Sequence, residues 1–121
     1  MKTFIPGNKT ILVADDDTNL RGFIKVVLEK AGCKVIEACD GKEAVDKFVL
    51  NSSQVDLLVL DVMMPRKNGT DAHDEIRKLK PGIKAVFISG FQDEAISTRA
   101  DFIPKPFTSQ ALLNHMSGLF Y

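Results

Sequence analysis

Short runs of aliphatic and β-branched residues recur along the chain and predict five β-strands. The runs cover residues 10–14, 34–38, 55–60 and 83–88 and, more weakly, 101–103. Three of them are almost continuously apolar, which is typical of strands that are buried on both faces. A sheet built from such strands needs helices on each side.

The segments between these strands carry apolar residues at helical spacing. In 20–31 the apolar positions follow three- and four-residue steps, and Gly32 is placed to end that helix. The other predicted helices cover 41–49, 70–79 and 108–119. Strand and helix alternate along the chain, which predicts an α/β fold with a doubly wound parallel sheet and helices on both faces.

Polar residues in front of these helices are suited to cap them. Asp40, followed three residues later by Glu43, resembles a capping pair, and Thr108 is placed to cap the last helix. Asp17 precedes the first helix, where an aspartate is expected to be an N-cap or a surface acid. These residues support the predicted helix starts.

The composition is that of one ordinary globular domain. The chain has 121 residues, and 16 Lys and Arg balance 16 Asp and Glu, so its formal net charge is zero. Nucleic-acid-binding domains usually carry a basic patch, so we expect no direct nucleic-acid binding. No apolar run reaches the roughly 18–20 residues needed to cross a bilayer, and no signal peptide is evident. We expect a cytoplasmic protein without membrane contact, with an N-terminal tail at 1–8 and one domain at 9–121.

The two cysteines flank the second predicted strand. An extended segment between Cys33 and Cys39 would hold their Cα atoms about 20 Å apart, too far for a disulfide bond. Neither belongs to a zinc-binding pattern. We therefore expect two reduced thiols without a metal.

Charged and polar residues follow four of the five predicted strands. In a parallel α/β sheet, working groups lie beyond the carboxyl ends of the strands. These residues are Asp15, Asp16 and Asp17 after the first strand, Asp61 after the third, Ser89 after the fourth and Lys105 after the fifth. We expect their side chains to converge on one edge of the sheet.

Such a group of side chains is suited to phosphoryl transfer. Crowded carboxylates repel one another unless a cation compensates their charge, and Mg²⁺ prefers oxygen ligands of this kind. Lys105 adds a second positive charge, and Ser89 can donate a hydrogen bond to an anionic oxygen. Carboxylates act as nucleophiles that form aspartyl-phosphate, which predicts transfer of a phosphoryl group onto Asp61.

Four motifs in this order resemble the receiver domain of two-component response regulators. They are residues 11–17, residues 56–65 with Asn68-Gly69, Ser89-Gly90, and residues 102–107. The resemblance covers nearly the whole chain from about Lys9 onward. It implies a flavodoxin-like, five-stranded sheet with strand order 2-1-3-4-5. The short interval between Ser89 and Lys105 leaves room only for a shortened fourth helix, expected within 93–99.

The resemblance also implies roles for the acidic residues. Asp61 would accept a phosphoryl group from the phosphohistidine of a histidine kinase or a histidine phosphotransfer protein. Asp16, Asp61 and the backbone carbonyl of Met63 would bind Mg²⁺, while Asp15 would hold a metal-bound water. The chain would thus be a phosphoacceptor with self-phosphorylation and autodephosphorylation chemistry rather than an enzyme in the ordinary sense.

Lys105, Ser89 and Phe102 take the remaining roles that the resemblance implies. Lys105 would pair with the carboxylate of Asp61 and then with the phosphoryl oxygens. Ser89 would move to bind the phosphoryl group, and Phe102 would follow it inward as an aromatic switch. A cis peptide bond is implied before Pro106, which an X-Pro bond readily allows.

Other functions remain open at this stage. A phosphatase of the haloacid-dehalogenase-like type would use an Asp-x-Asp-x-Thr or Val pattern at Asp15, Asp17 and Asn19, and the last position fails. A flavin- or nucleotide-binding module needs a phosphate-binding loop where three aspartates stand. A receiver-like chain that docks to partners without being phosphorylated is a further alternative.

The surroundings of these motifs give weaker indications. The segment 80–91 resembles receivers at the end of hybrid sensor kinases, although a free-standing regulator is also consistent with the chain. A weak homodimer is one further option. We interpret Arg66 and Lys67 as a solvated loop that could attract an acidic partner, and His73 and His115 as surface or packing residues.

Overall fold

A computed structural model describes residues 7–90 and 101–120 of the chain. Its elements are β1 (Thr10–Ala14), α1 (Thr18–Lys30), β2 (Lys34–Ala38), α2 (Gly41–Asn51), β3 (Val55–Asp61), α3 (Gly69–Leu79), β4 (Lys84–Ser89), β5 (Asp101–Pro104) and α5 (Ser109–Phe120). The five strands lie where the apolar runs predict them. The shortened helix expected within 93–99 lies outside the described residues.

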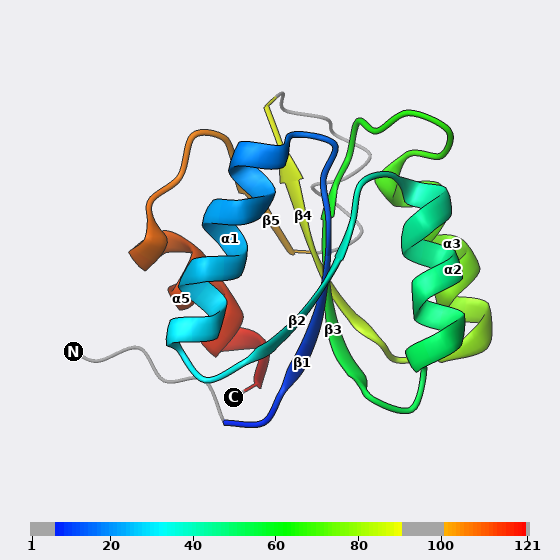
Figure 1. Ribbon diagram of the computed structural model, residues 1–121, viewed down its shortest axis with the longest axis horizontal. Coiled ribbons are helices and arrows are strands. Elements are labelled where there is room, and N and C mark those ends of the chain that lie inside the picture. Colours follow the sequence, from blue (N-terminus) through cyan, green and yellow to red (C-terminus); the bar gives the residue numbers. More distant parts are fainter. Residues whose placement is uncertain (1–6, 91–100, 121) are drawn as a thin grey trace.

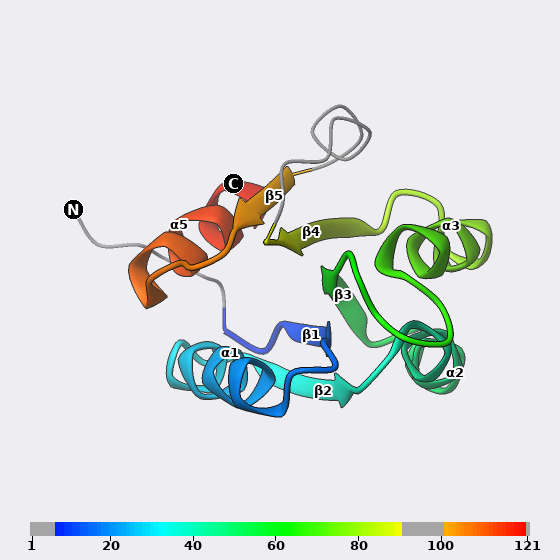
Figure 2. The same cartoon turned by 90° about the horizontal axis from the view of Figure 1, so that it is seen from above.

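The strands form one parallel sheet in the order β2-β1-β3-β4-β5, which confirms the predicted architecture. Helices α1 and α5 cover one face, and α2 and α3 cover the other (Figures 1 and 2). All five carboxyl ends therefore lie at the same edge of the sheet.

Side chains of the central strands alternate between two hydrophobic cores. In β1, Ile11 and Val13 pack with Ile24 of α1 and Met116 of α5. The intervening residues of the same strand pack with α2 and α3, where Phe48 is fully buried. Because both faces of the strand are covered, its residues 11–14 are all apolar instead of alternating with polar residues.

The strand register determines which polar residues become neighbours. Ala14 at the end of β1 pairs with Leu60 of β3, so Asp15, just beyond β1, and Asp61, the last residue of β3, lie side by side. Ser89 at the end of β4 pairs with Pro104 of β5. Residues far apart in the sequence are thus brought to one edge.

The predicted caps are confirmed. The side chain of Asp17 accepts hydrogen bonds from the backbone amides of the next residues in α1, and Asp40 accepts one from Glu43 N at 2.7 Å. Thr108 Oγ1 accepts one from Ala111 N at 3.0 Å. Gly32 ends α1 with a φ of 98°, a conformation that glycine adopts without steric strain.

Residues outside the sheet edge are mainly structural. His73 is buried on α3 with its ring edge-on to Phe87, in agreement with a packing role. Cys33 and Cys39 are free thiols, the first buried and the second exposed. Across 7–90 and 101–120, each helix is too short or too polar to span a membrane.

Candidate functional site

Three aspartates form a cluster where β1 and β3 end. Carboxylate oxygens of Asp15, Asp16 and Asp61 all lie within 4.8 Å of one another. Asp15 and Asp61 are buried, whereas Asp16 is exposed at the edge of the sheet. The cluster is therefore open to solvent at Asp16.

Lys105 is the positive charge that faces this cluster. Its Nζ lies 3.3 Å from Asp61 Oδ2 and 3.7 Å from Asp15 Oδ2. Its backbone N–H donates to the carbonyl of Ser89 at 2.8 Å, which holds the segment after β5 beside the end of β4. The Lys105–Pro106 peptide bond is cis, as the resemblance implies.

Burial raises the pKa values of both Asp15 and Asp61. Burial and then the charge of Asp15 raise the pKa of Asp61 from 3.8 to about 6, although Lys105 and a backbone hydrogen bond from Met63 oppose this. Burial also raises the pKa of Asp15, against a hydrogen bond from the amide of Asp17. Added positive charge would therefore stabilise the ionised cluster.

The donor set of the cluster fits Mg²⁺. Oδ2 of Asp15 is buried and has no hydrogen-bond partner within the described part of the chain. A buried oxygen without a donor is unfavourable unless a cation or an ordered water completes it. Carboxylate oxygens from three residues at one solvent-accessible point are the hard ligands that Mg²⁺ prefers.

The other predicted site residues surround this cluster. Ser89 is buried at the end of β4. Phe102 of β5 is half-buried, pairs in register with Phe87 and packs against the core beneath α2 and α3. Met63 is 68% exposed, and its backbone amide contributes to lowering the pKa of the Asp61 carboxylate.

Two residues that position the cluster were missed from the sequence. Arg21 Nη1 donates to the backbone carbonyl of Asp15 at 2.6 Å, while its Nε pairs with Glu37 at 3.2 Å. A Cβ atom on Gly69 would lie 2.2 Å from the backbone oxygen of Asp61, so only glycine fits there. Neither contact has a local sequence signal, apart from the place of Gly69 in the family motif.

The interpretation of Arg66 and Lys67 as a solvated loop is wrong in part. Arg66 is exposed, yet it forms an ion pair with the buried Asp40, and Lys67 forms one with Glu75. Both side chains thus connect the loop after β3 to neighbouring helices. The physical reason is that Asp40, at the entry to α2, is too buried to be left without a countercharge.

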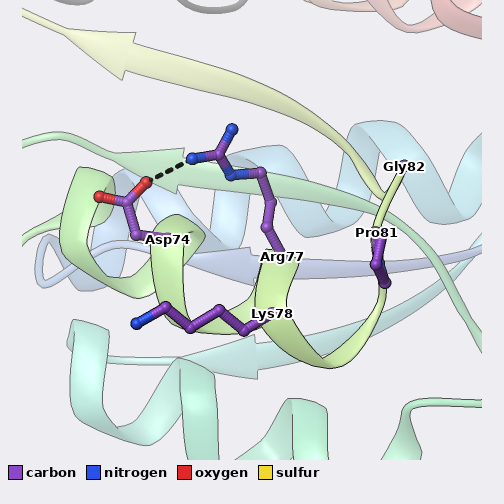
Figure 3. A pocket seen from close by; sticks show the side chains of 5 residues that line it. All are labelled: Asp74, Arg77, Lys78, Pro81 and Gly82. Carbon is purple, nitrogen blue, oxygen red and sulfur yellow. Dashed lines mark hydrogen bonds and ion pairs between the residues drawn. The ribbon is translucent and has the colours of Figure 1, made fainter.

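A second hollow lies at the opposite end of α3 and is separate from this site. It has a volume of about 580 Å³ and is lined by Asp74, Arg77, Lys78, Pro81 and Gly82 (Figure 3). Arg77 pairs with Asp74 at 2.9 Å on the exposed surface. The hollow therefore lies near the amino end of β4, whereas Asp61 and Ser89 lie at the carboxyl ends of β3 and β4.

Known proteins share this sequence pattern and this fold. Residues 11–117 match the response regulator receiver domain. The chain is 37% identical over 106 residues to the chemotaxis protein CheY of Thermotoga maritima, covering 82% of this chain and 87% of that protein. It is 33% identical over 116 residues to the sensor kinase CckA of Brucella abortus, covering 91% of this chain and only 12% of the kinase.

A solved structure agrees with this assignment. The receiver domain of the hybrid histidine kinase CckA superposes with a TM-score of 0.82 at 29% sequence identity, covering 93% of this chain and 99% of that chain. The chain belongs to the response regulator receiver domain family.

Proposed function

We propose that the chain is a phosphorylation switch in which Asp61 accepts a phosphoryl group from a phosphohistidine. The donor would be a histidine kinase or a histidine phosphotransfer protein. The observation that carries this proposal is the position of Lys105 Nζ, 3.3 Å from the buried Asp61 carboxylate within the acidic cluster. A buried carboxylate with an adjacent ammonium group is suited to become, and then to stabilise, an aspartyl-phosphate.

The transfer is a direct displacement. An Asp61 carboxylate oxygen forms a bond to phosphorus while the bond between phosphorus and the donor imidazole nitrogen breaks. The bonding electron pair leaves with the imidazole, which takes up a proton. The ammonium group of Lys105 compensates negative charge on the transferred group, and its ion pair with Asp61 moves to the phosphoryl oxygens.

Mg²⁺ would be held by Asp15, Asp16, Asp61 and the backbone carbonyl of Met63. When bound, it supplies positive charge that lowers the repulsion between these carboxylates and an incoming phosphoryl group. Oδ2 of Asp15, which has an ion pair with Lys105 but no hydrogen-bond partner in the described part of the chain, supports this assignment. Asp15 acts from the buried side of the cluster and Asp16 from the exposed side.

Ser89 and Phe102 would transmit the effect of Asp61 phosphorylation to the surface of the domain. Ser89 stands at the same edge of the sheet and offers a hydroxyl group to the phosphoryl oxygens. Phe102 lies on the neighbouring strand and is only half-buried, so a turn inward would bury more of its ring. The phosphorylated chain is then read by a partner through its altered surface.

The chain could serve as a free-standing regulator or as the receiver of a hybrid kinase, and both forms would work in the cytoplasm. It spans 87% of the CheY relative but 12% of the CckA relative. In either setting the stimulus is sensed elsewhere, and this domain stores it as a covalent modification. The proposal therefore concerns the chemistry at Asp61, which both settings share.

The deciding experiment is intact-protein mass spectrometry after incubation with acetyl phosphate. We expect the gain of one phosphoryl group in Mg²⁺ and none in EDTA or in the Asp61→Asn variant. A phosphorylated histidine phosphotransfer protein serves as a second donor. If neither donor labels the chain while Mg²⁺ binds, the chain is a docking module. Multiple-turnover release of phosphate from small phosphomonoesters would instead indicate a phosphatase.

A further inference from the structure

The loop between β3 and α3 (62–68) is tied to the start of α2 by an unusual ion pair. Arg66 Nη1 lies 3.3 Å from Asp40 Oδ2. The arginine side chain is 56% exposed, but that of Asp40 is only 5% exposed. The other oxygen of Asp40 accepts the Glu43 amide at 2.7 Å. Asp40 therefore uses one oxygen to cap α2 and the other to hold the loop.

The backbone of the same loop rests on the first residue of α2. A Cβ atom built on Gly41 would lie 2.0 Å from the carbonyl oxygen of Lys67 and 2.7 Å from its carbonyl carbon. The Lys67 side chain continues to α3, where it pairs with Glu75. The loop is thus fixed between two helices at adjacent residues, and its backbone has no room to move toward α2.

The backbone conformation of Arg66 shows how firmly the loop is held. Its φ is 68°, in the left-handed region that side chains other than glycine and asparagine seldom adopt. Such a conformation persists where surrounding contacts over-determine it. Here the contacts are the Asp40 carboxylate on one side and the Gly41–Lys67 approach on the other.

The loop also touches the residue that is proposed to be phosphorylated. The backbone amide of Met63 faces the Asp61 carboxylate and contributes to lowering its pKa. The Gly69 amide donates to the Val62 carbonyl at 3.0 Å, which closes the loop beneath Asp61. Because the loop is short and closed, we expect a shift at Arg66 to change the position of the Met63 amide.

We propose that Asp40 and Arg66, with the Gly41–Lys67 contact, form a clamp whose function is to position the Met63 backbone against Asp61. Asp40 and Arg66 are positioning residues that act through Met63. Without the clamp the loop would sample other conformations, and the Asp61 carboxylate would lose its fixed orientation toward Lys105. The part that concerns phosphorylation rests on the proposed function, whereas the part that concerns loop geometry does not.

The test removes the ion pair without removing the helix cap. Asp40→Asn keeps an oxygen for the Glu43 amide, and Arg66→Gln keeps the length of most of the side chain. The matched control is Arg77→Gln, because the Arg77 side chain is about as exposed as that of Arg66 and forms an ion pair with Asp74 on α3. Circular dichroism on each variant verifies that it is folded, and Arg66→Lys tests rescue by charge alone.

Two measurements on the full chain then separate the outcomes. We expect the Met63 amide to exchange with solvent about tenfold faster in Asp40→Asn and Arg66→Gln. We expect labelling by acetyl phosphate to slow by about tenfold, with the double variant no slower than either single variant. Arg77→Gln should match the parent in both measurements, and Arg66→Lys should recover part of the loss.

Either measurement can overturn the proposal. If folded variants retain the parent's Met63 exchange and the parent's labelling rate, the clamp does not position the loop. If exchange rises but labelling is unchanged, the clamp orders the loop without serving Asp61, and the proposal is wrong. If the parent itself is not labelled, the proposed function fails, while the exchange measurement still decides whether the clamp positions Met63.

Discussion

Charged side chains at the two ends of the sheet have different kinds of partner. At the amino end, Lys80 Nζ donates to the carbonyls of Ser52 and Val55 at 3.0 and 2.7 Å, and Lys84 donates to the Leu119 carbonyl. At the carboxyl end, Asp15 and Asp61 lie buried beside each other and share Lys105. The lysines at the amino end bind backbone carbonyls, whereas the two buried carboxylates at the carboxyl end have one lysine between them.

This difference separates a structural end from a functional end. A lysine that binds backbone carbonyls stabilises the fold without any ligand. Buried like charges destabilise the free chain, and a cation or a phosphoryl group together with a cation relieves that cost. The same kind of substitution should therefore affect phosphorylation and the response to Mg²⁺ at the carboxyl end, but only the free energy of unfolding at the amino end.

The largest effect is expected from removing a lysine at the carboxyl end. Lys105→Met should slow labelling by acetyl phosphate by about a hundredfold, because a charge aimed at the reacting group is lost. The measurement is the initial rate of mass gain in Mg²⁺. Lys80→Met, which removes a lysine at the other end, is the control and should label at the parent rate. Equal rates for the two variants would contradict the comparison.

The next effect concerns pH in EDTA. The pKa of Asp61 is about 6 in the folded chain against 3.8 in the unfolded chain, so the folded chain binds more protons between these values. The free energy of unfolding should therefore fall as the pH rises from about 4 to about 7, by at most about 3 kcal/mol. Urea unfolding of Asp61→Asn should show a flatter profile and greater stability at neutral pH. The exposed Asp46→Asn should follow the parent.

Mg²⁺ should restore part of this stability. At a concentration ten times its Kd, a ligand of the folded state alone adds about 1.4 kcal/mol to the free energy of unfolding. We expect that gain for the parent at pH 7 and its loss in Asp61→Asn, measured by urea unfolding. Equal gains in both proteins would place the cation elsewhere, and Ca²⁺ in place of Mg²⁺ tests the preference for a small ion.

The smallest effect is expected at the amino end. Lys80→Met should lower the free energy of unfolding by about 1 kcal/mol, because its two backbone partners lose their donor. Arg77→Gln, which breaks an exposed ion pair nearby, should cost less than about 0.5 kcal/mol. Neither loss should depend on Mg²⁺, which contrasts with the carboxyl end.

Most of the fold could be predicted because local and global signals agree. The apolar runs are long enough to be buried on both faces, and Asp17, Asp40 and Thr108 stand where helices begin. The convergence of Asp15, Asp61 and Lys105 was also predictable. A parallel sheet brings the residue after each strand to one edge, whatever the distance along the chain.

What could not be predicted depends on contacts between elements. An arginine in an amphipathic helix is normally solvated, and no periodicity indicates that Arg21 reaches the Asp15 carbonyl. A glycine at a helix start has several explanations, of which the approach of Lys67 to Gly41 is only one. The ion pair between Arg66 and Asp40 forms because two loops lie close together in the fold, and the sequence alone does not reveal that distance.

The strand order also has a consequence for synthesis. β1 and β3 are adjacent in the sheet, and both precede β4 in the chain. A growing chain can therefore assemble its carboxylates before Lys105 has been made. During that interval a divalent ion from solution is the available countercharge. Nascent chains ending after β4 should resist protease better when Mg²⁺ is present, and this difference should shrink once β5 is complete.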